Sequence, residues 1–156
     1  MENELSFGAT PGVLAHTADI NDFLAGVTQL MEPGTVLVSQ SHWLVALTRK
    51  FEFDTIYHEH LRYYTLNSLT RLFQRHGLVV YDAEITDFYG GSILSYANKS
   101  AQGGSESLNS ILAQEDQTDV VQSLREMKQV LLTNRARLIN LLVDLRNSGQ
   151  RVVGIG

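Results

Sequence analysis

One segment of this chain, residues 53–64 (FDTIYHEHLRYY), concentrates the side chains that can move a proton or hold a charge. Histidine has the unperturbed pKa nearest neutrality, so His58 or His60 can accept and return a proton at physiological pH. The carboxylate of Glu59 can orient a neighbouring imidazole or stabilise its charged form. The Tyr57 hydroxyl can donate a hydrogen bond to a developing oxyanion. The spacing therefore indicates acid–base chemistry, and it fits equally well a polar loop whose histidines are only hydrogen-bonded.

Metal binding is an alternative use of the same segment. His58 and His60 share a face only on an extended backbone, because side chains two residues apart diverge by about 200° on a helix. A metal ion would also need a third ligand, for which His16 and His42 are candidates. An isolated His-x-His pair binds no metal by default, so acid–base chemistry is the preferred interpretation.

Composition limits the class of protein. The chain has 156 residues, of which 44% are hydrophobic, so it can bury the core of one domain or of one domain plus part of another. A net charge of −5 disfavours nucleic-acid binding, and the absence of cysteine excludes disulfides and thiolate metal sites. The sequence contains neither a membrane-spanning run nor the pattern of a signal peptide. We therefore expect a cytoplasmic protein with no nucleic-acid or membrane partner.

Helices and strands are predicted to alternate before the reactive segment. Residues 1–12 are predicted to be a flexible arm, and residues 13–16 (VLAH) could form a truncated strand that ends in a histidine. Apolar residues then recur at helical spacing as far as residue 31, with Thr17 as the expected N-cap. A buried strand at residues 35–38 follows, which makes a helix–strand unit typical of a parallel sheet.

An antiparallel pair of strands is predicted after the reactive segment. Residues 39–50 are ambiguous, although part of them could form a short helix. Asn67 is the expected N-cap of the next helix. Strands are predicted at residues 78–85 and 92–98, and a hairpin-like connection joins them.

The C-terminal part of the chain carries the strongest helical periodicity. Residues 99–118 are predicted to be a linker and a short helix, and residues 119–147 a helix roughly 40 Å long. Its apolar face could form a dimer seam, although packing against its own domain is commoner. Residues 151–156 (RVVGIG) are typical of the first strand and glycine turn of a further α/β unit, which predicts a truncated product.

Residues 53–78 (FDTIYHEHLRYYTLNSLTRLFQRHGL) resemble the signature of the S-adenosylmethionine-dependent sugar C-methyltransferases, which methylate a carbon of keto-deoxysugar nucleotides. The segments VLAHTADINDFLAGVTQLMEPGTVLV, YGGSILSYANK and GQRVVGIG resemble other parts of this family, so the resemblance covers about residues 13–156. It implies an α/β fold: the C-terminal part of a Rossmann-like methyltransferase sheet, with one parallel strand plus an antiparallel hairpin, and a long C-terminal helix. Residues 13–98 would be a partial methyltransferase domain, and residues 119–156 the long helix and first strand of a truncated C-terminal α/β domain.

The resemblance also implies roles for individual residues. His60 matches the general base that removes the proton alpha to the sugar ketone. Tyr57 and Glu59 match the neighbours that orient this base and steady the enolate, and His16 matches an upstream histidine placed at the enolate oxygen. The implied cofactor is S-adenosylmethionine, and the implied substrate is a nucleotide sugar.

Several features of the family are missing from this sequence. It has no cysteine-containing zinc domain and no glycine-rich first loop for the cofactor, and Ser39 and Gln40 stand where the family often has an acidic residue. Ile93 and Leu94 stand where an arginine is common. We therefore expect either a fragment that is inactive alone or a non-catalytic remnant α/β module that self-associates. An exposed sheet edge would invite pairing with a second copy or with a missing N-terminal half.

Overall fold

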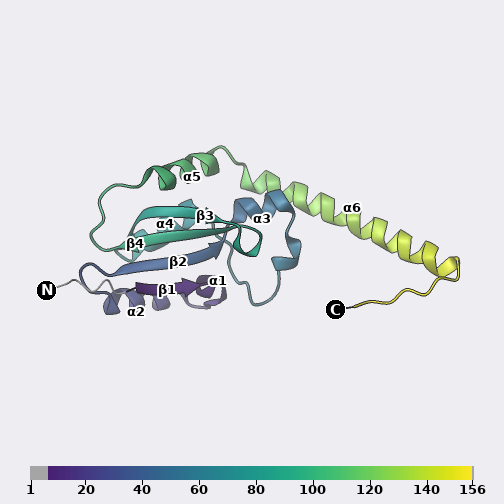
Figure 1. The fold of residues 1–156 in the computed structure, drawn as a ribbon, viewed down its shortest axis with the longest axis horizontal. Coiled ribbons are helices and arrows are strands. Elements are labelled where there is room, and N and C mark those ends of the chain that lie inside the picture. The colour runs from purple at the N-terminus through teal and green to yellow at the C-terminus, as the bar shows by residue number, and fades with distance from the viewer. Residues whose placement is uncertain (1–6, 156) are drawn as a thin grey trace.

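The computed structural model describes residues 7–155, which form a four-stranded sheet with helices packed around it and one long helix that projects from it (Figure 1). The elements in chain order are β1 (Phe7–Pro11), α1 (Val13–His16), α2 (Ile20–Leu30), β2 (Val36–His42), α3 (Leu44–Lys50), the 3₁₀ helix η1 (Phe53–Thr55), α4 (Leu66–Arg75), β3 (Val79–Thr86), the 3₁₀ helix η2 (Phe88–Gly90), β4 (Ser92–Asn98), α5 (Glu106–Asp116) and α6 (Val120–Asn147).

The sheet has the strand order β1-β2-β4-β3. β2 runs parallel to β1 and antiparallel to β4, and β4 runs antiparallel to β3. The predicted mixed α/β class and the antiparallel pair are therefore confirmed. The prediction of a flexible arm was wrong for residues 7–11, because this segment pairs with β2 from Phe7 opposite Val36 to Pro11 opposite Gln40. Residues 1–6 of that predicted arm lie outside the described residues.

The segment that carries His16 is a helical turn and not the truncated strand that was predicted. Gly12 has a left-handed backbone, with φ of 72°, which lets the chain reverse directly after β1. The Thr17 amide then donates to the Val13 carbonyl at 3.1 Å and closes one helical turn. Thr17 therefore ends α1, and the N-cap of α2 is Asp19, whose side chain accepts a hydrogen bond from the Asp22 amide.

The core lies on one face of β2 and β4, where alternate residues are buried. On this face β2 presents Leu37 and Ser39, and β4 presents Ile93, Ser95 and Ala97. These side chains belong to, or lie beside, a cluster to which α1, α2, α4 and α5 contribute buried leucines and other apolar residues. β2 continues through His42, beyond the predicted end at residue 38, because residues 39–42 pair with β4.

The start of α4 differs from the prediction. Thr65, not Asn67, is the N-cap, and its hydroxyl and that of Ser68 form a reciprocal capping box. The Asn67 amide instead donates to the carboxylate of Glu115 on α5, which is only 6% exposed. The same carboxylate accepts from the Leu66 amide. A buried acidic side chain from a distant helix therefore supplements the cap of α4.

α6 confirms the predicted long helix, and Asp119 caps its N-terminus. The helix packs against α3 near its start and then leaves the rest of the molecule (Figure 1). Residues 151–155 form no strand, so that prediction was wrong. A strand needs a neighbour for its backbone hydrogen bonds, and Val152, Val153 and Ile155 are exposed. Within residues 7–155, no helix combines the length and the apolar character needed to cross a membrane.

Candidate active site

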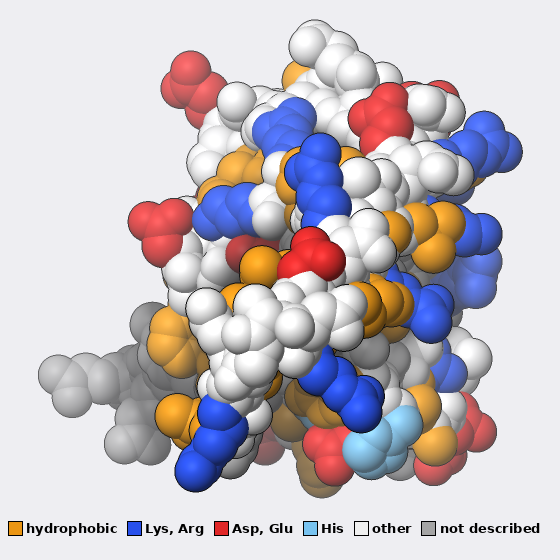
Figure 2. All heavy atoms as spheres, turned by 90° about the vertical axis from the view of Figure 1, so that its right-hand side faces the viewer, with side chains coloured by type: hydrophobic (Ala, Val, Ile, Leu, Met, Phe, Trp, Pro, Cys, Tyr) orange, Lys and Arg blue, Asp and Glu red, His pale blue; other side chains and the backbone are white. Residues whose placement is uncertain are grey.

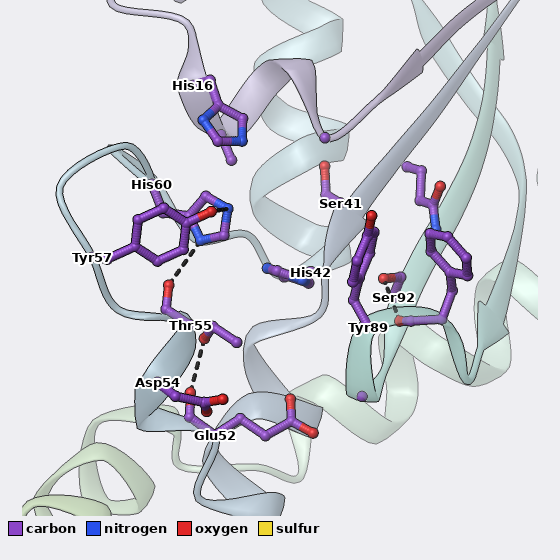
Figure 3. A pocket seen from close by; sticks show the side chains of 15 residues that line it. His16, Ser41, His42, Glu52, Asp54, Thr55, Tyr57, His60, Tyr89 and Ser92 are labelled. Carbon is purple, nitrogen blue, oxygen red and sulfur yellow. Dashed lines mark hydrogen bonds between the residues drawn. The ribbon is translucent and has the colours of Figure 1, made fainter. Parts of the chain in front are cut away.

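A cavity of about 850 Å³ opens where β2 ends, between α1, the loop that contains η1, and η2 (Figure 3). Its lining includes the imidazoles of His16, His42 and His60, the phenols of Tyr57 and Tyr89, and the hydroxyl of Ser41. These side chains come from segments that lie far apart in the sequence. The fold therefore gathers several proton-transfer groups around one space that is large enough for a small molecule.

His60 is held in a defined tautomer by two hydrogen bonds. Its Nδ1 lies 2.8 Å from the Thr55 carbonyl oxygen. Because a carbonyl can only accept, Nδ1 carries a hydrogen, and in the neutral ring the lone pair lies on Nε2. The Tyr57 hydroxyl lies 3.1 Å from this Nε2 and donates to it. The Tyr63 hydroxyl also donates to the Thr55 carbonyl, at 3.1 Å, which fixes the carbonyl that orients the ring. His60 is therefore arranged as a base at Nε2.

Hydrogen bonds between the loop after His60 and the region of α1 bring His16 into the site. They run from the Leu61 amide to the Ala15 carbonyl at 2.8 Å, from Arg62 Nη2 to the Ala18 carbonyl at 2.9 Å, from Arg62 Nη1 to the Thr17 carbonyl, and from the Tyr64 hydroxyl to the Leu14 carbonyl at 3.2 Å. As a result, the rings of His16 and His60 have centroids 4.8 Å apart (Figure 3). The structure therefore brings together the two imidazoles that the resemblance assigns to the proton and to the enolate oxygen.

Glu59 does not take the position that the sequence suggested. Its carboxylate lies 3.9 Å from Nε2 of His58, and both side chains point into solvent, with 61% of Glu59 and 90% of His58 exposed. Neither residue lines the cavity. Two residues within residues 7–155 hydrogen-bond the His60 ring, Thr55 and Tyr57, so the expectation that Glu59 orients His60 was wrong. A turn closed by the His60 amide and the Tyr57 carbonyl directs Glu59 outward.

His42 is the site residue whose position the sequence did not reveal. It had been considered only as a third metal ligand, yet its ring lies 5.1 Å from that of His60 and 5.7 Å from that of Tyr89. Burial, and secondly the nearby imidazoles of His60 and His16, lower the pKa of His42 below 6.5. His42 is therefore a neutral hydrogen-bonding group at neutral pH. The available signal was the length of the strand, since extending it beyond residue 38 places His42 at its end.

The described part of the chain contains no set of three histidine, aspartate or glutamate residues arranged to hold a metal ion. The metal hypothesis combined His58 and His60 with a third histidine, but the His58 side chain points away from the other two rings. The imidazoles that do meet have centroids about 5 Å apart and contact one another edge to face.

His42 should make the protein less stable as the pH falls below 6.5. Because its pKa is lower in the folded state than in the unfolded chain, the unfolded chain binds a proton first, and stability is lost between pH 6.5 and the lower folded pKa. Replacing His42 with Gln should flatten this part of the profile. Urea unfolding at several pH values measures it, with exposed His58→Gln as the matched control. An unchanged slope for His42→Gln would contradict the expectation.

The chain was compared with known protein families, curated proteins and solved structures. No family model matches the chain. It is 34% identical over 146 residues to the C-methyltransferase NovU of Streptomyces niveus, a match that covers 91% of this chain and 35% of the relative. The chain thus spans about a third of that relative's length. A crystal structure of the small RNA methyltransferase HEN1 matches with a TM-score of 0.45 and 13% identity, covering 67% of this chain and 15% of that one, which does not establish a shared fold. The sequence match confirms the predicted resemblance: this chain is related to C-methyltransferases over part of their length.

Proposed function

We propose that this chain is the part of an S-adenosylmethionine-dependent C-methyltransferase that removes a proton from a keto-deoxysugar nucleotide, and that His60 is the base. The main support is the position of His60: its Nε2, which accepts a hydrogen bond from Tyr57, lies in an open cavity beside His16. The sheet also supports the proposal. β2 runs parallel to β1, whereas β4 runs antiparallel to both β2 and β3, as expected for the C-terminal part of a Rossmann-like methyltransferase sheet.

The proton step follows from the tautomer of His60. Nε2 would remove the proton from the carbon alpha to the ketone, and the imidazolium formed would keep its hydrogen bond from Nδ1 to the Thr55 carbonyl. Tyr57 donates to Nε2 in the free site, so its hydroxyl has to turn away before the base can act. Tyr57 is 43% exposed, which leaves room for this movement. Once released, the phenol is a hydrogen-bond donor beside the reacting carbon.

The enolate oxygen needs donors on the side of the cavity opposite the base. His16 has its ring 4.8 Å from that of His60, and neutral His42 approaches His60 from another segment. The Ser41 hydroxyl also lines the cavity, and it is buried without a hydrogen-bond partner among residues 7–155. A buried hydroxyl that lacks a partner costs free energy until a ligand supplies one. Ser41 is therefore a further candidate to bind a substrate oxygen.

S-adenosylmethionine would supply the methyl group that the enolate carbon accepts. The residues described here do not by themselves fit the whole of this cofactor. A glycine-rich loop between a strand and a helix occurs at Gly103 and Gly104, but it does not line the cavity. β1 is an edge strand with one side unpaired among the described residues. Among these residues, no further strand beyond β1 adds side chains to the site.

This chain alone should bind S-adenosylmethionine weakly. Without a loop whose backbone amides cradle the cofactor, most of the binding free energy is missing. Isothermal titration calorimetry of the purified chain should detect no binding at cofactor concentrations on the order of 10 μM. Micromolar affinity would contradict this expectation and would mean that the cavity itself holds the cofactor.

The proposed function is tested by reconstitution. The chain is mixed with a separately purified cofactor-binding segment of a C-methyltransferase, S-adenosylmethionine and a keto-deoxysugar nucleotide, and the product is analysed by mass spectrometry for a methyl group on carbon. Methylation that depends on this chain would support the proposal. Failure to form the product, or formation that His60→Ala leaves undiminished, would contradict it.

A further inference from the structure

Tyr89 has a backbone conformation that tyrosine rarely adopts. Its φ of 50° and ψ of 43° are left-handed, and Gly90 and Gly91 follow with φ of 79° and 141°. Glycine tolerates such angles, whereas a residue with a Cβ atom adopts them at a cost in free energy. Among residues 7–155, Phe51 is the other non-glycine residue with a positive φ. A strained residue persists only where its surroundings hold it, and such residues are common at functional sites.

Contacts with α3 and with the residue that follows β2 hold the turn that contains Tyr89. The Lys50 ammonium donates to the Gly90 carbonyl, and the Trp43 amide donates to the Gly91 carbonyl at 3.0 Å. Lys50 is the last residue of α3, and Trp43 directly follows the end of β2. The turn is therefore fixed to the strand that also carries His42 into the cavity.

Two glycines let this turn lie directly against α3 and the residues that follow it. A Cβ atom on Gly91 would lie 2.6 Å from that of Ala46, and a Cβ atom on Gly90 would collide with the Glu52 carboxylate. The left-handed backbone begins one residue earlier, at Tyr89, where local preference alone would favour glycine or asparagine. The tyrosine side chain must therefore contribute something other than local backbone stability.

The strained turn places the Tyr89 phenol in the wall of the cavity. Its ring lies 5.7 Å from that of His42, and the ring of His60 lies 5.1 Å from His42 on the other side (Figure 3). Within residues 7–155 the Tyr89 hydroxyl makes no hydrogen bond, whereas the Tyr57 hydroxyl donates to His60. Tyr89 therefore offers a free hydroxyl to a ligand, one imidazole beyond the proposed base.

We propose that the Tyr89 hydroxyl donates a hydrogen bond to an uncharged oxygen of the sugar and so holds the sugar while His60 faces its acidic carbon. A ligand that reaches from His60 across the ring of His42 meets the Tyr89 phenol next. The inference rests on the proposed function, because it requires a sugar in this cavity. It adds a substrate-binding residue on the side of His42 opposite the base.

The charges around the cavity favour the sugar, and not the diphosphate of the nucleotide, as the ligand of Tyr89. The lining contains no lysine or arginine, but it contains the carboxylates of Glu52 and Asp54, which repel phosphate. Lysines and arginines lie elsewhere, for example across the face on which α6 projects (Figure 2). The neutral imidazole of His42 and the unpartnered hydroxyl of Ser41 line the same cavity and suit uncharged oxygens.

Tyr89→Phe tests the hydrogen bond, since it removes the hydroxyl and keeps both the ring and the strained backbone. In the reconstituted assay it should raise the KM for the keto-deoxysugar nucleotide about three- to tenfold, as expected for one hydrogen bond, and change kcat by less than about twofold. NMR titration of the chain with the same nucleotide sugar should show a matching rise in Kd. Tyr81→Phe is the matched control, because Tyr81 lies on β3 outside the cavity, and it should change neither value.

Tyr89→Asn tests the origin of the strain, because asparagine adopts left-handed angles more readily than tyrosine. The urea midpoint of unfolding should stay the same or rise, while KM should rise at least as much as in Tyr89→Phe. Phe51→Asn is the control: its φ is 56° but it does not line the cavity, so it should relieve strain and leave KM unchanged. A lower midpoint for Tyr89→Asn would mean that the phenol stabilises the fold, and would overturn the assignment of the strain to ligand binding.

The results for Tyr89 and His60 separate this inference from the proposed function. If Tyr89→Phe keeps the parent values of KM and Kd while His60→Gln abolishes methylation, the proposed function stands and the inference about Tyr89 is overturned. If Tyr89→Phe weakens binding while His60→Gln leaves proton exchange alpha to the ketone unchanged, Tyr89 binds the sugar and the base is another group.

Discussion

Replacing His60 with Gln should lower the rate of methyl transfer in the reconstituted assay by about 10²- to 10⁴-fold, the range that general base catalysis supplies. Glutamine can still donate an amide hydrogen to the Thr55 carbonyl, but it has no basic nitrogen to take the place of Nε2. The loss should fall on the catalytic rate constant more than on substrate affinity. It is measured as initial rates of carbon methylation at saturating substrate.

His58→Gln provides the control, since His58 lies two residues earlier in the same loop and its side chain is 90% exposed outside the cavity. It should keep the rate of the parent chain. Proton exchange at the carbon alpha to the ketone, followed by NMR in deuterated water, isolates the step assigned to His60. An exchange rate that His60→Gln leaves unchanged would remove His60 from the role of base, even if methylation were impaired.

The largest loss of stability should come from Glu115→Ala, with a decrease of about 2–4 kcal/mol in the free energy of unfolding. The Glu115 carboxylate accepts hydrogen bonds from the Trp43 indole at 2.7 Å, the Leu66 amide at 2.6 Å and the Asn67 amide at 2.8 Å. Alanine would leave these donors without their acceptor in a region with little access to water. It would also remove a negative charge from the N-terminal end of α4, where the helix dipole favours one.

Urea denaturation of the parent chain and three variants measures this loss. Glu115→Gln should fall between the parent and Glu115→Ala, because its amide keeps one acceptor oxygen but points an NH₂ group at a donor. Asp116→Ala, one residue further along α5, removes an exposed carboxylate and should cost less than about 0.5 kcal/mol. Equal midpoints for the two alanine variants would show that the buried carboxylate contributes nothing to stability.

The spacing of apolar residues along the chain predicted those helices and strands that are evident from their own residues. The repeat of apolar residues predicted α6, and the run at Ser92–Asn98 predicted β4. β1 was missed because its structure depends on pairing with β2, which lies more than twenty residues later. The cap of α4 was predicted at Asn67, but Thr65 and Asn67 are both residue types that can cap a helix. A contact with Glu115, from a distant segment, decides between them, and the local sequence does not show this contact.

The site was also predictable only in part, because some of its residues are positioned by contacts between distant segments. Residue types in the 53–64 segment identified Tyr57 and left His58 and His60 as alternatives, and the family resemblance selected His60 and added His16. The direction of Glu59 could not be predicted, because the loop between η1 and α4 has no regular period that assigns side chains to faces. His42 enters the cavity because β2 extends to its full length beside β4, which is a tertiary contact.

The hydrogen bonds from the Leu61, Arg62 and Tyr64 region to the carbonyls of residues 14–18 set the distance between the two imidazoles. Each of these bonds is made to main-chain oxygen, so most side-chain changes at the accepting residues leave it intact. A deletion or insertion between Gly12 and Ala18 would instead shift every acceptor by one place and turn His16 away from its partner ring. Apart from His16 itself, this region therefore tolerates changes of residue type better than changes of chain length.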